Sequence, residues 1–473
     1  MKSYEPFFFI AMNAKHAHLF LAAFLWMPMP ILAQSAPLCR IEVVEKGSGW
    51  PVPLVELRTT HLLRYVSDNA GVIAFDAPEL MGVETWFDVI SPSYGVPKDG
   101  FGMRGVRLKP EPGKTLRVEV TRSSIARRLG RLTGGGLFAE SERLDPTKDE
   151  GAESGLLGCD SVQNAVHNGK MFWAWGDTIL PGYPMGLFDM SSATTDLRPL
   201  TSFEPPLRLK FDYFRDDKGK PRGVAKMPGS GPTWLSGYAS LPDRSGRAHL
   251  VGVYIKVRGY LEAYESGMCV WKEEGNQFEH LRTLWTKSEA SPKQPPMPDG
   301  HPSLWKDPQG KDWLYFGNPF PTMRVPATYE AWLDPHTWEP LTAQAELTAA
   351  DGAEKVVPHS GSIAWNAFRK RWLTIFMQNK GKPSSFGELW YAEAPAPTGP
   401  WGTAVKVLSH ENYTFYNPRL HPEFTPADSP ILLFEGTYTQ QFVEKPIATP
   451  RYDYNQILYR LDLDDPKLKP AQP

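Results

Sequence analysis

A motif that recurs about five times after residue 155 constrains the fold of this chain more than any other feature. Each copy opens on a cluster of polar or small residues, makes a tight turn, and continues as a short aromatic strand that ends in a polar residue. The first copy reads Gly-Cys-Asp-Ser at 158–161, turns at 167–169, and runs through Met-Phe-Trp-Ala-Trp into Gly-Asp-Thr at 176–178. Self-similarity with a period of roughly 50 residues predicts a β-propeller.

Four later copies open at 237–240, 301–303, 359–361 and 417–418, and the one at 237 is the most degenerate. In a propeller blade, the start of the first strand and the end of the second lie at the same end of the channel. The residues expected there are Asp160, His301, His359 and Asn417 at strand starts, and Asp177, Asn318, Asn379 and Glu435 at strand ends. Polar groups that converge on one concave mouth are typical of a ligand site. Asp and Asn also favour turns for local reasons, so solvated turn residues are the alternative interpretation.

Composition indicates a soluble globular protein of two or three domains. The 473 residues are 41% hydrophobic with a formal net charge of −2, so no basic excess suggests a nucleic-acid partner. Aromatic residues make up 12% of the chain, including 16 Trp. Sugar C–H faces stack on aromatic rings, so this content is compatible with a carbohydrate partner.

The N-terminus has the pattern of a secretory signal. Lys2 and Lys15 precede an apolar run from 18 to 32, and Ala-Gln-Ser at 33–35 supplies small residues at a cleavage site. We therefore expect a signal peptide over 1–35 and a secreted or periplasmic protein, with an uncleaved anchor as the alternative. No later stretch is apolar enough for an integral membrane segment after signal removal.

Three cysteines, Cys39, Cys159 and Cys269, exclude a complete disulfide framework. One bridge is compatible with the sequence, and the sequence does not select the pair. Cys159 lies beside Asp160, but a small buried hydrophobe at the start of a strand is a better interpretation than a catalytic thiol.

Residues 40–122 predict a separate small β domain. Alternating strands flank a Ser-Asp-Asn-Ala-Gly turn at 67–71, and a second strand reads Pro-Val-Pro-Leu-Val-Glu-Leu at 51–57. These two segments resemble the transthyretin-like sandwich of carboxypeptidase regulatory-like domains, which implies an accessory module. A basic connector over 122–131 then leads to the propeller at 133–465. The predicted fold class is all-β, with an N-terminal β-sandwich followed by a five-bladed β-propeller.

The blade motifs resemble five-bladed glycoside hydrolases of the arabinanase, xylosidase and levansucrase type. The resemblance lies in the first-blade motifs, in Phe-Glu-Gly-Thr-Tyr at 434–438 and in Arg-Tyr-Asp-Tyr-Asn at 451–455. It implies a carbohydrate substrate and a carboxylate pair. Asp160, with Asp177 as its alternative, would be the base. Glu435 would be the acid, because burial after an apolar strand would keep it protonated.

Further residues are predicted to contact the substrate: His301, His359, Asn417, Glu262, Glu265, Trp175, Tyr438 and Asp453. Glu262 and Glu265 are also rivals for the acid, since they lie in an aromatic stretch of the second blade. The histidines near blade openings, His301, His359 and His421, have no metal-ligand spacing. No metal site or cofactor is therefore predicted, although a channel ion would fit the resemblance.

The chain departs from the resembled family in its second blade. Trp234 and Tyr238 stand where an acidic residue that modulates pKa is expected. This departure keeps two alternatives to a glycoside hydrolase open. One is a non-catalytic carbohydrate-binding or surface-interaction propeller, and the other is a polysaccharide lyase that uses Tyr or His as its base.

Overall fold

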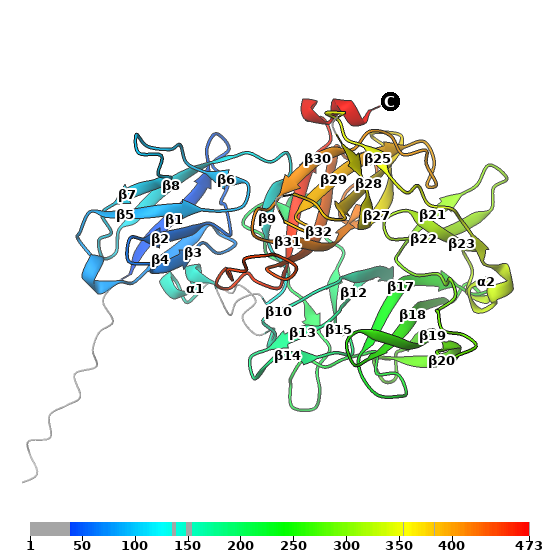
Figure 1. Cartoon of the computed structure of the whole chain (residues 1–473). Helices are drawn as coiled ribbons and strands as arrows, with labels where there is room; N and C mark the ends of the chain where they lie inside the picture. Colours follow the sequence, from blue (N-terminus) through cyan, green and yellow to red (C-terminus); the bar gives the residue numbers. More distant parts are fainter. Residues whose placement is uncertain (1–37, 135–138, 148–153, 353, 383, 473) are drawn as a thin grey trace, which may run out of the picture. The chain divides into compact units, whose positions relative to one another are not determined.

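The computed structural model describes residues 38–472, apart from 135–138, 148–153, 353 and 383. The signal peptide predicted over 1–35 lies outside the described residues. Within them, no helix is both long and apolar enough to cross a membrane. Strands dominate the chain, as the sequence predicts (Figure 1).

The N-terminal part forms two four-stranded sheets that share one core. The first sheet has the order β4 (Val72–Phe75), β1 (Cys39–Glu45), β8 (Thr115–Arg122), β6 (Tyr94–Gly95). The second has the order β3 (Arg64–Val66), β2 (Glu56–Thr59), β5 (Thr85–Ile90), β7 (Gly105–Leu108). Alternate residues of both sheets, such as Ile41, Val43 and Phe87, enter a common apolar cluster. This arrangement is a β-sandwich.

Five four-stranded antiparallel sheets follow, and they are the five predicted blades. Blade one contains β11 (Gln163–His167), β12 (Lys170–Trp175), β15 (Ser191–Asp196) and β16 (Asp212–Tyr213). Blade two contains β17 (Thr233–Pro242), β18 (Ala248–Arg258), β19 (Glu262–Lys272) and β20 (Gln277–Thr286). Blade three contains β21 (His301–Lys306), β22 (Asp312–Gly317), β23 (Pro321–Pro326) and β24 (Glu339–Pro340).

Blade four contains β27 (Pro358–Asn366), β28 (Arg371–Gln378), β29 (Glu388–Ala394) and β30 (Val405–Ser409). Blade five contains β31 (Thr414–Leu420), β32 (Ile431–Thr439), β33 (Asn455–Asp462) and β9 (Arg127–Arg131). The first strands of successive blades contact one another, β11 with β17, β17 with β21, β21 with β27 and β27 with β31. Arg419 of blade five donates to Asn164 of blade one and so completes the ring. The prediction of an all-β chain with a sandwich and a five-bladed propeller is confirmed.

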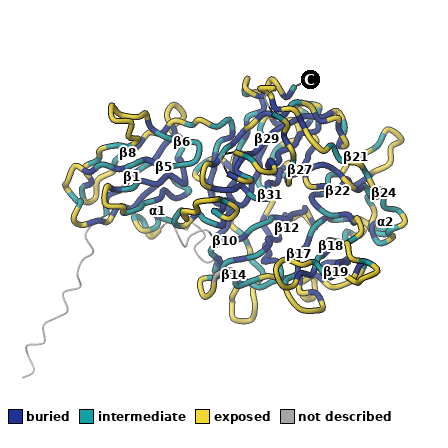
Figure 2. The backbone as a smooth tube through the Cα atoms, viewed as in Figure 1, coloured by how far each residue is buried: buried dark blue, intermediate teal, exposed yellow. Residues whose placement is uncertain are grey.

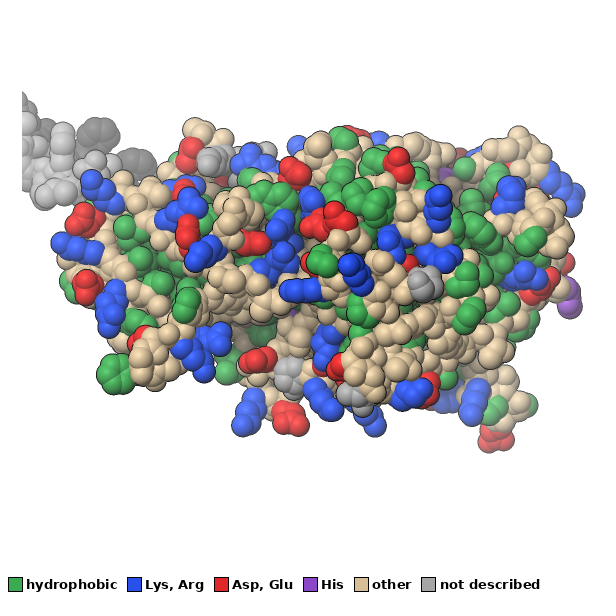
Figure 3. Space-filling model, turned by 90° about the horizontal axis from the view of Figure 1, so that it is seen from above, with side chains coloured by type: hydrophobic (Ala, Val, Ile, Leu, Met, Phe, Trp, Pro, Cys, Tyr) green, Lys and Arg blue, Asp and Glu red, His purple; other side chains and the backbone are tan. Residues whose placement is uncertain are grey.

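Smaller elements decorate the blades. A three-stranded sheet joins β10 (Gly158–Cys159), β13 (Thr178–Leu180) and β14 (Tyr183–Leu187), and a short hairpin joins β25 (Leu347–Thr348) and β26 (Lys355–Val356). The helices are α1 (Glu140–Leu144) and α2 (Tyr329–Leu333), with 3-10 turns at Pro78–Leu80, Leu200–Phe203, Pro335–Thr337, Pro422–Phe424 and Pro466–Ala471. Strands are buried and the connecting loops are exposed (Figure 2). On the face in Figure 3, basic and acidic side chains are intermixed.

The basic segment 122–131, which reads as a connector, contains a strand of the propeller. β9 pairs antiparallel with β33 and is therefore the outermost strand of blade five. The other strands of that blade come from the C-terminal part of the chain. The ring is thus closed by hydrogen bonds between segments more than 300 residues apart, as between Ile457 and Arg131.

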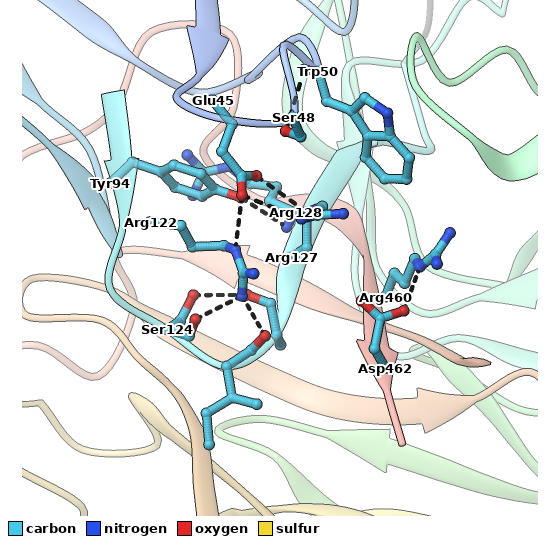
Figure 4. Close-up of polar contacts among 12 residues, drawn as sticks. Glu45, Ser48, Trp50, Tyr94, Arg122, Ser124, Arg127, Arg128, Arg460 and Asp462 are labelled. Atoms are coloured by element: carbon cyan, nitrogen blue, oxygen red, sulfur yellow. Dashed lines mark hydrogen bonds and ion pairs between the residues drawn. The ribbon is translucent and has the colours of Figure 1, made fainter. Parts of the chain in front are cut away.

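Charged and aromatic side chains fix β9 to the sandwich (Figure 4). Arg127 donates to both carboxylate oxygens of Glu45 at 3.1 and 3.2 Å, and Arg122 donates to the same carboxylate at 3.3 Å. The Trp50 ring lies under the guanidinium groups of Arg127 and Arg460, at 4.5 and 5.3 Å. Glu45 is only 7% exposed, so these charge-assisted bonds act in a partly desolvated setting.

Arg128 is the most deeply buried cation of this junction. Its guanidinium donates to the carbonyl oxygens of Pro53, Pro92 and Leu54 at 3.0, 3.0 and 3.3 Å, and to Ser91 Oγ at 2.6 Å. The side chain comes from the closing strand, and every one of these acceptors belongs to the sandwich segment 53–92. One residue therefore satisfies four buried acceptors across the junction.

The three cysteines are free and buried, so the structure contains no disulfide among them. Burial raises the pKa of each thiol above its usual value. Cys159 packs with Trp173 and Trp175 in an apolar cluster, in agreement with a structural role.

We expect Arg128→Met to destabilise the protein by about 3 kcal/mol, because it leaves buried carbonyl oxygens without donors. The matched control is Arg117→Met, since Arg117 pairs with Glu119 at 3.4 Å on the surface of the sandwich and should matter by about 0.5 kcal/mol or less. Urea unfolding of both variants measures the difference. Equal losses would show that the junction does not depend on Arg128.

Candidate functional site

Asp160 is held at the entrance to blade one by a tyrosine and two close backbone approaches. The Tyr454 hydroxyl donates to Asp160 Oδ2 at 2.7 Å. A Cβ on Gly176 would lie 2.1 Å from Asp160 Oδ1, and a Cβ on Gly158 would lie 2.1 Å from the Tyr454 carbonyl oxygen. The glycines of the Gly-Cys-Asp-Ser and Trp-Gly-Asp-Thr motifs are therefore required for close packing around this carboxylate.

Asp177 lies in the bend between β12 and β13. The backbone N–H of Asp160 donates to the Asp177 carbonyl at 3.3 Å, and Gly176 N–H donates to the Asp160 carbonyl at 2.9 Å. The Trp234 indole N–H, from the start of blade two, donates to Asp177 Oδ1 at 3.0 Å. The structure thus brings the two first-blade carboxyls together, with Trp234 occupying the second-blade position where an acid was expected.

Both carboxyls have raised pKa values. Desolvation raises the pKa of Asp160 to about 7, against an opposing contribution from the Tyr454 hydrogen bond, and the charge of Asp177 raises it further. Desolvation also raises the pKa of Asp177, while the Trp234 N–H lowers it. A partly buried carboxyl that titrates near neutrality, beside a second one, is suited to proton transfer.

Blade five also holds Ser161, the residue next to Asp160. Thr437 Oγ1 accepts from the Ser161 backbone N–H at 3.2 Å and from Gln456 Nε2 at 2.9 Å. Asn417 Nδ2 donates to Ser161 Oγ at 2.5 Å. Ser161, Asn417 and Tyr454 all adopt left-handed backbone conformations, with φ of 43°, 48° and 61°. Strained non-glycine residues of this kind cluster at ligand and active sites.

Glu435 does not reach this site. β32 continues to Thr439, so Glu435 lies within the strand, and the prediction that it ends the strand is wrong. Its side chain is 0% exposed and accepts from His421 Nε2 at 3.0 Å. Side chains alternate along a strand, so Glu435 lies on the same face as Thr437 but deeper in the blade. In this conformation it cannot contact a substrate, which removes the predicted acid.

His301 and His421 belong to a buried polar cluster with Asn164, Arg419 and Glu435. His301 is 5% exposed, and burial lowers its pKa well below the usual value, with further contributions from Arg419 and His421. Asn164 Nδ2 is 3.0 Å from His421 Nδ1. Among the described residues, no group of three or more His, Cys, Asp or Glu side chains is arranged to hold a metal. Burial therefore favours the neutral form of His301.

The remaining predicted residues lie elsewhere. Trp175 is fully buried and stacks on Trp173 at 6.0 Å, and Tyr438 is 1% exposed and stacks on Tyr413 at 4.0 Å, so the structure contradicts a role for either side chain in substrate contact. Both lie in the apolar clusters that join blades.

The acidic rivals are also occupied. Glu262 is exposed and pairs with Lys287 at 2.7 Å, and Glu265 accepts from the Tyr254 hydroxyl at 2.8 Å. Asp453 accepts from the Gln440 backbone N–H at 2.8 Å and so supports a loop. His359 is exposed and packs against Phe386, with ring centroids 4.4 Å apart.

Sequence reasoning missed two residues of the site. Tyr454 lies beside Asp453 in the motif at 451–455. Asp453 was predicted as a site residue because it has a carboxylate, but Tyr454 is the residue that contacts Asp160. Tyr416 precedes Asn417, and desolvation raises its pKa, with smaller contributions from the charges of Asp160 and Asp177. β31 begins at Thr414 and not at Asn417 as predicted, so Tyr416 lies within the strand.

No family model and no curated protein matches the chain. Among solved structures, it is similar to an exo-1,5-α-L-arabinanase from a bovine ruminal metagenomic library, at 12% identity, with 65% of this chain and 94% of that chain covered and a TM-score of 0.38. It is similar to a GH43_1 enzyme from Xanthomonas citri in complex with xylose at 10% identity, with 65% of this chain and 87% of that chain covered and a TM-score of 0.36. It is also similar to an N-acetylgalactosamine deacetylase from F. plautii at 11% identity, with 71% of this chain and 95% of that chain covered and a TM-score of 0.39. Similarities this low assign no activity, so the function rests on the site itself.

We expect Gly176→Ala to displace the Asp160 carboxylate and to destabilise the protein by about 2 kcal/mol, because the new methyl group overlaps Oδ1. Gly182→Ala is the control, since nothing lies within 4 Å of its added Cβ in the same blade region. Thermal unfolding distinguishes the two variants. Equal stability of both would contradict the close approach.

The pKa of Asp160 predicts a pH dependence of stability. Its folded value of about 7 exceeds the ordinary value of 3.8, so its favourable contribution is complete below about pH 4 and is lost as pH rises through 7. Asp160→Asn keeps a neutral acceptor for Tyr454. It should therefore gain stability relative to wild type between pH 5 and pH 8, by at least about 1.4 kcal/mol, the equivalent of one pKa unit.

Asp243→Asn is the control, because hydrogen bonds from Ser245 and His249 lower the pKa of Asp243, which is therefore ionised at both pH 5 and pH 8. It should lose stability relative to wild type by the same amount at both pH values. Urea unfolding at both pH values provides the comparison. An Asp160→Asn difference that is the same at pH 5 and pH 8 would rule out the raised pKa.

Proposed function

We propose that the protein is a glycoside hydrolase that cleaves a polysaccharide or oligosaccharide at the Asp160–Asp177 site. One observation carries the proposal: two desolvated carboxyls with raised pKa values lie together at the start of blade one. Glycoside hydrolysis uses two carboxyl groups in different protonation states. Two such groups with unequal environments provide both states near neutral pH.

The environments suggest which group does what. Asp160 keeps its proton up to about pH 7, so we assign it the transfer of that proton to the glycosidic oxygen as the C–O bond breaks. Desolvation raises the pKa of Asp177, but the Trp234 N–H opposes that shift by bonding the carboxylate, so we assign Asp177 the removal of a proton from the attacking water. The water oxygen forms the new bond to the anomeric carbon. This division replaces Glu435, which has no access to solvent in the described structure.

The two alternatives fare differently. The withdrawal of Glu435 from solvent favours a non-catalytic carbohydrate-binding propeller, since the resembled family's acid would then have no counterpart. A lyase is less well supported, because a base must give up its proton readily. Tyr454 instead donates to Asp160, and burial and the charge of Asp160 raise its pKa far above the usual value. A polymeric substrate also agrees with the proposed secretion through the segment at 1–35.

The decisive experiment is incubation of the protein with arabinan, xylan, galactan and levan, followed by measurement of new reducing ends. We expect cleavage of one of these polymers, with a rate that falls as pH rises through about 7, where Asp160 loses its proton. Asp160→Asn and Asp177→Asn should each lower the rate by roughly 10²–10⁴-fold while the fold persists.

Glu262→Gln serves as the surface control and should leave the rate unchanged, since Glu262 only pairs with Lys287. Glu435→Gln should retain most of the activity. A loss in this variant as large as that in Asp160→Asn, with normal unfolding, would return the acid role to Glu435. A rate that rises through pH 7 would exchange the two Asp roles, and no cleavage of any polymer would favour the binding alternative.

A further inference from the structure

Four aromatic rings form a continuous row beside the carboxyl pair. The ring of His359 lies 4.4 Å from that of Phe386, which lies 5.6 Å from Phe442, which in turn lies 5.7 Å from Tyr416. They come from β27, the loop before β29, the loop after β32 and β31. We call these four side chains the aromatic row. Its members come from blades four and five and are far apart in the sequence.

The row is partly open to solvent, and two of its residues have unfavourable backbone conformations. Phe442 is 55% exposed, His359 is exposed, and Phe386 and Tyr416 are partly buried. Phe386 and Phe442 have φ of 57° and 65°, in the left-handed region that bulky residues rarely occupy. An apolar ring is not expected to be held at such a cost in water unless the position serves binding.

The row leads directly to the site. Tyr416 at its end is adjacent to Asn417, which bonds Ser161 next to Asp160. The charges of Asp160 and Asp177 also contribute to the raised pKa of Tyr416. A ligand that lies along the rings would therefore pass from blades four and five to the carboxyl pair of blade one at the contact between Asn417 and Ser161.

We propose that the aromatic row binds the sugar residues next to the bond that the carboxyl pair cleaves. Carbohydrate is the occupant that these features favour, since sugar C–H faces pack on aromatic rings and the row ends at hydrogen-bonding groups. The imidazole of His359, which is exposed although partial desolvation lowers its pKa, adds hydrogen-bonding nitrogen atoms to the distal end. The inference rests on the proposed function, but it concerns binding and can be tested without turnover.

The test uses native gels that contain each of the four soluble polysaccharides, with Asp160→Asn as the parent so that the polymer stays intact. We expect one polymer to retard the parent, and Phe442→Ala to weaken that retardation about tenfold in dissociation constant. Phe442→Trp should keep the retardation, because it restores a stacking face. Phe442 is half exposed, so its removal should leave the unfolding midpoint unchanged.

Phe101→Ala is the matched control. Phe101 is 95% exposed on a turn of the sandwich held by Asp99, outside the row, so its loss should have no effect on retardation. In the cleaving wild type, Phe442→Ala should raise KM more than it lowers kcat, because the row touches bound sugar and not the reacting atoms.

The outcomes separate the two proposals. Retardation that depends on Phe442, without cleavage by wild type, would contradict the proposed hydrolase activity and support the aromatic row as a sugar-binding site. Cleavage that is unaffected by Phe442→Ala would keep the hydrolase and overturn the row. No retardation by any of the four polymers would also overturn it. So would concentration-dependent self-association that Phe442→Ala abolishes, because the row would then be an interface between copies of this chain.

Discussion

The pairing of β9 with β33 is the interaction on which the rest of the structure depends. A propeller is a ring of sheets, and each sheet is stable only if its neighbours on both sides are in place. Here the ring is closed by a strand that comes before the first blade and completes the last one. The same strand carries Arg127 and Arg128, whose partners lie in the sandwich. Ring closure and attachment of the sandwich are thus one event, and the sandwich is more than the accessory module that its resemblance implies.

This closure also extends to the carboxyl pair. Asn69 of the sandwich exchanges two hydrogen bonds of 2.8 Å with the backbone of Arg131, at the end of β9. Tyr452, two residues before the tyrosine that holds Asp160, donates its hydroxyl to the Ser67 carbonyl at 2.7 Å. The loop that orients Asp160 is therefore fixed from the sandwich side as well as from blade five. The two parts of the chain jointly determine where the carboxylate lies.

Repetition along the sequence was enough to predict the architecture, because each blade carries its own turn and strand signals. It also located Asp160 and Asp177, whose adjacency follows from one hairpin. It failed for Glu435, since the length of β32 is set by pairing with β31 and β33, and local signals suggested an earlier end. The prediction that Trp175 contacts substrate failed because the sequence does not show which face of a strand packs against a neighbouring blade. The aromatic row was beyond sequence reasoning, since its rings meet only after blades four and five are assembled.

The buried cysteines have a consequence for chemical durability. Thiols react with oxidants as thiolates, and only where reagents can reach them. Cys39, Cys159 and Cys269 are each 0% exposed and have raised pKa values. None forms a bridge, so the fold gains nothing from an oxidising environment, and protection of the thiols means that it loses nothing there either. The folded state is therefore insensitive to the redox state of its surroundings.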